Sequence, residues 1–147
     1  TAEPDNLDNT LKSVKRIATY NGFDGWLMLN VYPQRATNPN DLDAEINNEL
    51  RLANTKHICT AIQELNIETI WVAYGDLIDS RNYLPFCMAD IFKELGSDLN
   101  WKIIGVPTKK GHPRHPLYKP TKSKLVDFNM EHYVTEKLRQ LNLEGIV

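Results

Sequence analysis

Acidic residues are absent between Lys102 and Lys124, although they outnumber basic residues over the whole chain, 19 against 17. The same segment contains seven lysine and arginine residues, so its formal charge is +7. The other ten basic residues are set against all 19 acidic ones, which leaves the rest of the chain at −9 and the total at −2. This uneven distribution predicts an anionic partner, because it concentrates positive potential on one surface.

Long apolar runs and cysteine-rich patterns are also lacking. No run approaches the roughly 18 apolar residues of a membrane-spanning helix, so no membrane partner is expected. Only Cys59 and Cys87 occur. Both have apolar neighbours in helical patterns, and no signal peptide precedes them, which favours reduced core thiols in a cytoplasmic protein. The length of 147 residues and the 41% hydrophobic content predict a single globular domain over residues 1–147.

Motifs that hold cofactors or activate small substrates are missing as well. The chain has neither a glycine-rich phosphate loop nor a nucleophile elbow, which counts against a small-molecule phosphoryl or acyl enzyme, and no cofactor is expected. His112 and His115 have the spacing of a short metal-binding pair, but Pro113 and Pro116 prevent the helix that would align them. No third ligand stands nearby in the sequence, so no metal site is predicted.

The hydrophobic patterns predict helices that alternate with strands. Residues 1–6 should form a tail or loop, a cap at Asp8 or Asn9 should start the first helix, and Asn21-Gly22 should end it. The later helices are expected over about 43–65, 80–95 and 130–141, and the strands over about 26–31, 69–74 and 102–106. This alternation predicts an α/β fold, a three-layer α/β/α sandwich with a mostly parallel sheet and helices on both faces.

Ligand sites of parallel sheets lie beyond the carboxyl ends of the strands. The segments that follow the three predicted strands are 32–42, 75–79 and 107–129, so their polar residues should meet at one rim. The candidate ligand-binding residues at this rim are Asn30, Tyr32, Arg35, Thr37, Gly75, Lys110, His112, Arg114, His115 and Tyr118.

Two of these segments carry a family resemblance. Asn30-Val31-Tyr32-Pro33-Gln34-Arg35-Ala36-Thr37-Asn38-Pro39-Asn40-Asp41-Leu42 and Gly111-His112-Pro113-Arg114-His115-Pro116-Leu117-Tyr118 resemble, in this order, two motifs of the domain-of-unknown-function 1643 family (DUF1643). Members of that family begin with an additional strand that ends in Asn-Pro-Ser-Thr-Ala, whereas this chain starts at Thr1-Ala2. We therefore expect the family's first strand and its site loop to be missing or different here.

A more distant resemblance links the chain to the uracil-DNA glycosylase superfamily. Leu27-Met28-Leu29-Asn30, Val72-Ala73-Tyr74-Gly75 and His115-Pro116 fall in the order of three motifs of that superfamily. The resemblance implies its fold, a base-reading role for Asn30, and an approach of His115-Pro116 to a flipped nucleotide. His115 is then the candidate catalytic residue. Leu117 replaces the serine expected after the proline, and the motif that activates water belongs to the first strand, which is expected to be missing.

Several candidates allow two interpretations. The Asn30 amide suits a base edge because it both donates and accepts hydrogen bonds, or it satisfies backbone groups at a strand end. Arg35 and Thr37 form either an anion clamp or a solvated turn. Histidine titrates near neutrality, so His115 is either a donor to an oxyanion or phosphate or an exposed bystander.

Two classes of function therefore stay open. In the first, the rim binds a nucleotide or a nucleic acid, with glycosylase-like hydrolysis as an additional step. Lys110 and Arg114 then supply electrostatic attraction, while Asn30 and Tyr118 select the base or ring. In the second, the protein is a non-catalytic regulatory or interaction module whose basic loop docks on an acidic protein surface. Steep salt dependence of binding distinguishes a phosphate-bearing partner, because phosphate contacts release counterions.

Overall fold

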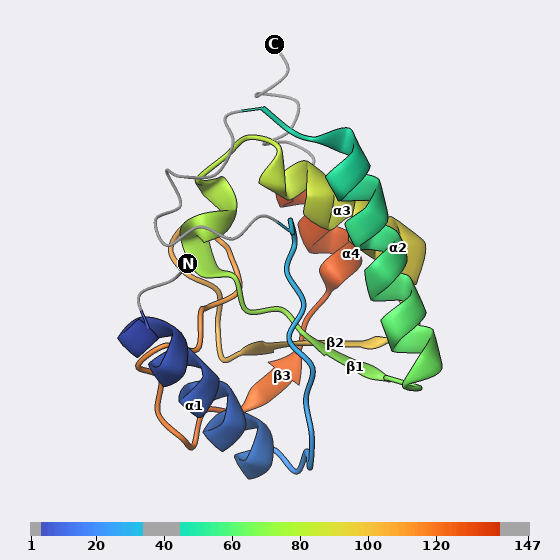
Figure 1. Ribbon diagram of the computed structural model, residues 1–147. Coiled ribbons are helices and arrows are strands. Elements are labelled where there is room, and N and C mark those ends of the chain that lie inside the picture. Colours follow the sequence, from blue (N-terminus) through green and yellow to red (C-terminus); the bar gives the residue numbers. More distant parts are fainter. Residues whose placement is uncertain (1–3, 34–44, 139–147) are drawn as a thin grey trace.

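The computed structural model of the protein describes residues 4–33 and 45–138 (Figure 1). Its elements follow the chain in the order α1 (Pro4–Tyr20), α2 (Asn48–Glu64), β1 (Thr69–Trp71), the 3-10 helix η2 (Gly75–Asp79), α3 (Leu84–Leu95), β2 (Asn100–Ile104), β3 (Leu125–Asp127), α4 (Met130–Tyr133) and the π-helix η3 (Val134–Leu138). The mixture of helices with a small three-stranded sheet confirms the predicted α/β class.

The sheet has the strand order β1-β2-β3 and is mixed. β1 and β2 are parallel, with Ile70 opposite Trp101, which confirms the parallel pairing predicted for these two strands. β3 is antiparallel to β2, with Val126 opposite Ile103, so the mostly parallel sheet was wrong in this half. β3 lies inside the segment that was predicted as one long loop, 107–129. Its three residues are too few to produce an alternating hydrophobic pattern.

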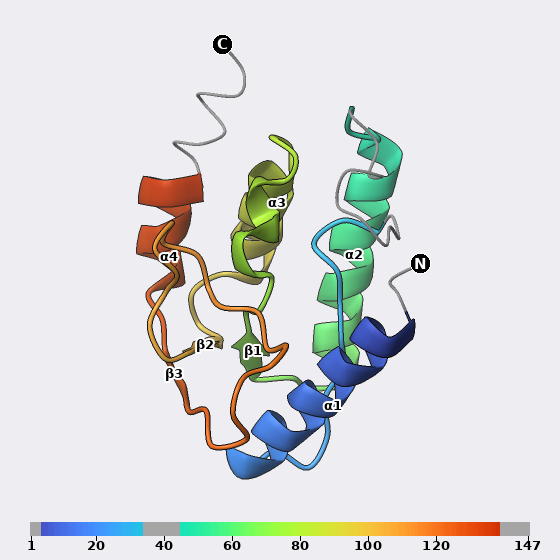
Figure 2. The same ribbon diagram turned by 90° about the vertical axis from the view of Figure 1, so that its left-hand side faces the viewer.

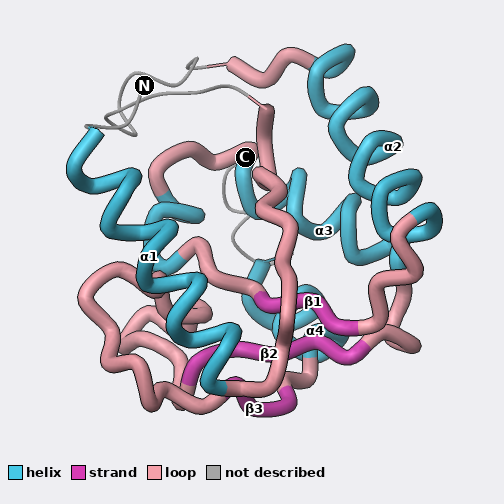
Figure 3. The backbone as a smooth tube through the Cα atoms, turned by 60° about the horizontal axis from the view of Figure 1, so that its bottom comes forward, coloured by secondary structure: helices cyan, strands magenta, loops and turns pink. Residues whose placement is uncertain are grey.

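The predicted strand at 26–31 was wrong. Figure 3 shows this segment as a loop, and the structure assigns no strand to it. Trp26, Leu27 and Met28 remain 44, 48 and 43% exposed, which a central strand covered on both faces would not allow. The segment is instead held by Asn54 on α2, whose side-chain Nδ2 donates to the backbone oxygens of Asn30 and Val31 at 2.8 and 3.2 Å.

Helix boundaries differ from the predicted ones for local reasons. α1 starts at Pro4, a residue favoured in the first turn, rather than at the expected cap. It ends at Tyr20, directly before Asn21-Gly22, as predicted. α2 begins after Asn47, whose side-chain oxygen accepts from Leu50 N at 3.2 Å, a standard N-cap. The last helix continues from α4 into the π-turns of η3.

The helices are not distributed evenly around the sheet. α2, α3 and α4 lie together on one side of it, while α1 lies apart from them, beside the loop between β2 and β3 (Figures 1 and 2). The main apolar core joins α2, α3, η3 and the sheet. Its largest fully buried members include Ile78, Ile103, Met130 and Leu138. The three-layer arrangement of the uracil-DNA glycosylase type stays a prediction.

Candidate functional site

Two segments meet beyond the carboxyl ends of the parallel strands. η2 follows β1, and residues 105–124, which we call the basic loop, follow β2. Gly75 lies directly against His115: a Cβ atom placed on it would lie 3.2 Å from His115 Cβ. Gly75 also has φ +63°, a left-handed conformation that side chains disfavour. The predicted convergence of 75–79 with the basic loop is therefore realised at Gly75 and His115.

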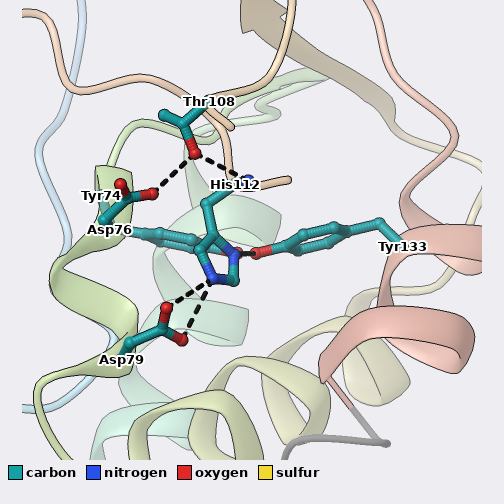
Figure 4. A network of polar contacts seen from close by, with 6 residues as sticks. All are labelled: Tyr74, Asp76, Asp79, Thr108, His112 and Tyr133. Carbon is teal, nitrogen blue, oxygen red and sulfur yellow. Dashed lines mark hydrogen bonds and ion pairs between the residues drawn. The ribbon is translucent and has the colours of Figure 1, made fainter. Parts of the chain in front are cut away.

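A chain of hydrogen bonds, largely buried except at Asp79, joins the basic loop to η2 and α4 (Figure 4). His112 is fully buried. Its Nε2 lies 3.0 and 3.1 Å from the two carboxylate oxygens of Asp79, and its Nδ1 lies 2.7 Å from Tyr133 Oη. Tyr74 Oη donates in turn to Tyr133 Oη at 2.8 Å. We call Asp79, His112, Tyr133 and Tyr74 the buried network.

The donor directions in the buried network follow from one another. The Asp79 carboxylate only accepts hydrogen bonds, so His112 Nε2 carries a proton and donates it to Asp79. In the neutral tautomer Nδ1 is then an acceptor, and the Tyr133 hydroxyl donates to it while accepting from Tyr74. Burial raises the pKa of Tyr74 well above its usual value, and burial likewise raises the pKa of Tyr133. Both phenols therefore stay protonated, as this chain of donors requires.

Thr108 makes a second connection between the basic loop and η2. Its Oγ1 donates to Asp76 Oδ1 at 2.6 Å and accepts from the backbone N of His112 at 3.2 Å. Its backbone N donates to the His112 carbonyl at 2.8 Å, which closes the turn that carries Lys109 and Lys110. The turn is thus fixed at its base while both of its lysines are exposed to solvent.

Arg114 fastens the start of the basic loop from within. Its Nε donates to the Val106 carbonyl at 2.8 Å, and its Nη2 donates to the Pro107 carbonyl at 3.3 Å. Pro113 and Pro116 on either side are fully buried. The guanidinium was predicted to attract a ligand, but two of its donors already form hydrogen bonds within its own loop.

His115, the candidate catalytic residue, is partly buried beside Gly75. Burial lowers its pKa below the usual value of 6.5, which favours the neutral imidazole. Its Nδ1 accepts from the backbone N of Leu117 at 3.1 Å, so the ring proton belongs on Nε2. Nε2 has no hydrogen-bond partner in the part of the chain that the structure describes. His115 is thus equipped to donate one hydrogen bond without carrying a charge.

The five lysines of the basic loop lack acidic partners in the described structure. Within residues 4–33 and 45–138, no ion pair involves any of them. These lysines are Lys109, Lys110, Lys119, Lys122 and Lys124. Tyr118, among them, is 78% exposed and has φ +62°. Lys102 differs, because it belongs to β2 and pairs with Asp127 at 2.6 Å.

The other predicted site residues have different surroundings. Asn30 is exposed, and its backbone oxygen accepts from Asn54. Tyr32 is buried in the core, where its hydroxyl accepts from Asn47 N at 2.9 Å. Neither residue forms a hydrogen bond with the basic loop in the described structure. Arg35 and Thr37 lie outside the described residues.

The sequence interpretation missed the partners of His112. Gly75-Asp76 was regarded only as the end of a strand, yet an Asp-x-x-Asp pattern directly after a strand end was a signal for polar contacts at that rim. Tyr133 carried no such signal, since it follows an apolar helical pattern. Among the described residues, no group of three or more His, Cys, Asp or Glu side chains is arranged to hold a metal ion. None of the described helices has the length and apolar content needed to cross a membrane.

These features define a mixed α/β protein in which a cationic loop is fastened to the carboxyl edge of a parallel strand pair. The model of a family described as protein of unknown function (DUF1643) matches residues 1–117, well over half of the chain. The protein belongs to this family, as its motifs predicted. No curated protein and no solved structure matches the chain. The likeness to the uracil-DNA glycosylase superfamily is supported by none of these comparisons.

Proposed function

We propose that this protein binds a phosphate-bearing ligand, a nucleotide or a nucleic acid, through the basic loop. The observation that carries the proposal is the set of five loop lysines without an acidic partner in the described structure. Lysines that serve only solubility are commonly interspersed with acids, whereas this loop excludes acids over its whole length. Their summed positive potential attracts anions and raises the rate at which they associate.

The contacts behind the loop support binding because they hold it in one conformation. His112 joins it to Asp79, Thr108 joins it to Asp76, and Arg114 braces its first residues. A loop that is already ordered loses less conformational entropy when a ligand arrives. The buried network therefore acts in this proposal as a support for the lysines, and His112 does not touch the ligand.

Two ring side chains supply the contacts that lysines cannot. Tyr118 offers an exposed aromatic face, on which a base can stack. His115 Nε2 offers a neutral N–H donor for a phosphate oxygen. Base selection by Asn30 and anion binding by Arg35 and Thr37 belong to the same proposal.

The main proposal is ligand binding. Glycosylase-like hydrolysis is an additional step, which is tested separately. Such hydrolysis needs a group that activates water. His115 stays the candidate catalytic residue, but its Nδ1 already accepts from Leu117 N and its Nε2 carries the proton, so its part in this step is to donate a hydrogen bond to the departing base, and the water-activating group is a different one. Release of free base from a uracil-containing oligonucleotide, lost in His115→Gln but retained in Asn82→Ala, would support this step. A complete absence of release would leave binding as the whole function.

The test compares a lysine pair in the basic loop with a lysine pair elsewhere. Binding of a fluorescein-labelled single-stranded oligonucleotide and of a nucleoside monophosphate is measured at two salt concentrations, with wild type, Lys109→Ala/Lys110→Ala and the control Lys56→Ala/Lys93→Ala. Both pairs are exposed, and each double variant removes two charges. Loss of two phosphate contacts should reduce the slope of log K against log salt by about 1.4. The control should leave the slope unchanged.

Two results would contradict the proposal. One is the absence of binding at low salt to either ligand. The other is an equal loss in the control, which would mean that only the net charge matters. Binding of polyglutamate in the absence of any oligonucleotide binding would favour the alternative, an interaction module that docks on an acidic protein.

A further inference from the structure

A groove with a volume of about 540 Å³ lies between α1 and the far part of the basic loop. It is separate from the rim where Gly75 meets His115. Its lining is formed by Lys12, Lys15, Arg16, Thr19, Tyr20 and Thr121. Five of these residues come from α1, and Thr121 comes from the basic loop.

The exposed lining of the groove is almost entirely apolar, so it is formed by the hydrocarbon parts of these side chains. The helical repeat places the cations of α1 along this side of the helix. Lys12, Lys15 and Arg16 are spaced three and four residues apart and so share one face of the helix. The opposite face, with Val14 and Ile17, is buried. α1 therefore uses its apolar face for packing and leaves its basic face uncovered beside the loop.

Asn21 fixes the two walls of the groove relative to each other. Its Nδ2 donates to the Ser123 carbonyl at 2.9 Å, and its Oδ1 accepts from Leu125 N at 2.9 Å. The same Nδ2 is also 2.8 Å from the Ile17 carbonyl at the end of α1. One amide thus joins the end of the helix to the end of the basic loop, so the groove does not need to be assembled by a ligand.

The cations of the groove are available for an anion. Lys15 forms no ion pair in the described structure. Lys12 pairs with Asp8 at 3.0 Å, but both side chains are 63% exposed, and such surface pairs are weak. Arg16 donates from Nη2 to Ser13 Oγ at 3.1 Å and keeps its other donors. Across the groove, Thr121 is followed in the chain by Lys122, and Lys119 precedes it by two positions.

We propose that this groove binds single-stranded nucleic acid: its apolar lining receives the bases, one of them stacked on Tyr20, while the cations of α1 and the basic loop hold the sugar-phosphate backbone. The inference rests on the proposed function and extends it: the ligand becomes a polymer that runs from the basic loop into the groove, rather than a mononucleotide. Proteins that bind single strands without reading their sequence combine cations, which follow the phosphate backbone, with exposed aromatic rings, on which the bases stack. Tyr20 is 44% exposed and can receive a base only from a strand whose bases are unpaired.

The test separates the groove from the basic loop. Affinities are measured for an oligothymidine of about 12 nucleotides, within the usual site size for single strands, for the duplex of equal length, and for thymidine monophosphate. Lys12→Ala/Lys15→Ala removes two groove cations and leaves the bond between Arg16 and Ser13 intact. It should weaken oligothymidine binding about 10-fold in low salt and flatten the salt dependence, as loss of two phosphate contacts requires. Monophosphate binding should not change.

The aromatic contact is tested with two substitutions at one position. Tyr20→Ala should weaken oligothymidine binding about 10-fold without changing the salt slope, because base stacking releases no counterions. Tyr20→Phe should retain wild-type affinity, since the ring remains. Helical content and the midpoint of thermal unfolding, measured for each variant, check that α1 is still folded.

The outcomes distinguish this inference from the proposed function. If neither the oligonucleotide nor the monophosphate binds, the proposed function fails and the inference falls with it. If Lys109→Ala/Lys110→Ala weakens both ligands while Lys12→Ala/Lys15→Ala weakens neither, the basic loop stands and the groove is overturned. Equal affinity for the duplex and the single strand would also overturn it, as would a loss with the control Lys56→Ala/Lys93→Ala as large as that of the groove pair.

Discussion

Tyr133→Phe tests the buried network through the free energy of unfolding. The substitution keeps the ring in the core and removes only the hydroxyl that joins Tyr74 to His112. The fully buried His112 then has no donor for its Nδ1, and the Tyr74 hydroxyl has no acceptor. A buried polar group without a partner costs about 1–3 kcal/mol, so the two together should destabilise the protein by about 2–6 kcal/mol.

Tyr74→Phe is the matched control for this change. It removes one hydrogen bond and leaves the Tyr133 hydroxyl donating to His112. The expected loss is about 0.5–1.5 kcal/mol, the usual net value of one hydrogen bond. Combining Tyr74→Phe with Tyr133→Phe should destabilise the protein less than Tyr133→Phe alone, because the Tyr74 hydroxyl that has lost its acceptor is then removed as well.

Urea unfolding followed by tryptophan fluorescence measures these differences, since the chain has three tryptophans. The urea midpoints should fall in the order wild type, Tyr74→Phe, Tyr133→Phe, with unchanged m-values. A loss below about 0.5 kcal/mol for Tyr133→Phe, the size of an ordinary surface substitution, would refute the donor directions assigned to the buried network. So would a larger loss for Tyr74→Phe than for Tyr133→Phe.

Three further predictions concern single positions. Gly75→Ala should lower the free energy of unfolding by more than the left-handed penalty of about 1–2 kcal/mol, because its Cβ would also press on His115 at 3.2 Å. The control Gly105→Ala, with φ +54° and nothing within 4 Å of its Cβ, should cost that penalty alone. Equal losses for the two variants in urea unfolding would contradict the close contact at Gly75. Burial lowers the pKa of His115, so the unfolded chain binds a proton that the folded chain does not, and the free energy of unfolding should fall as the pH drops below 6.5. His115→Gln should flatten this pH dependence of stability, and an unchanged profile would contradict the assignment to His115. Burial raises the pKa of Cys87 to about 12, so iodoacetamide at pH 8 should label the half-buried Cys59 first, as mass spectrometry of the native protein can show; equal rates would mean that Cys87 is accessible.

Sequence periodicity was sufficient where an element is specified by its own residues. The end of α1 at Asn21-Gly22, the apolar face of α3 and the parallel pairing of β1 with β2 were all predicted. The positive charge of the basic loop also followed from the sequence, since charge is set by composition alone. Membership of the DUF1643 family followed from the two motifs and is confirmed by the match over residues 1–117.

Sequence by itself determined local conformation and charge, because these depend on neighbours along the chain. Only the tertiary structure decided which segments besides β1 and β2 join the sheet. The apolar run Trp26–Val31 has the composition of a strand, but a strand exists only if another strand supplies its hydrogen bonds. In the structure the side chain of Asn54 bonds to two carbonyls of this run instead. The three residues of β3 become a strand because β2 lies beside them. In the same way His112, which was predicted to bind a ligand, contacts Asp79 and Tyr133, 33 and 21 positions away in the chain, because the fold brings η2 and α4 against its loop.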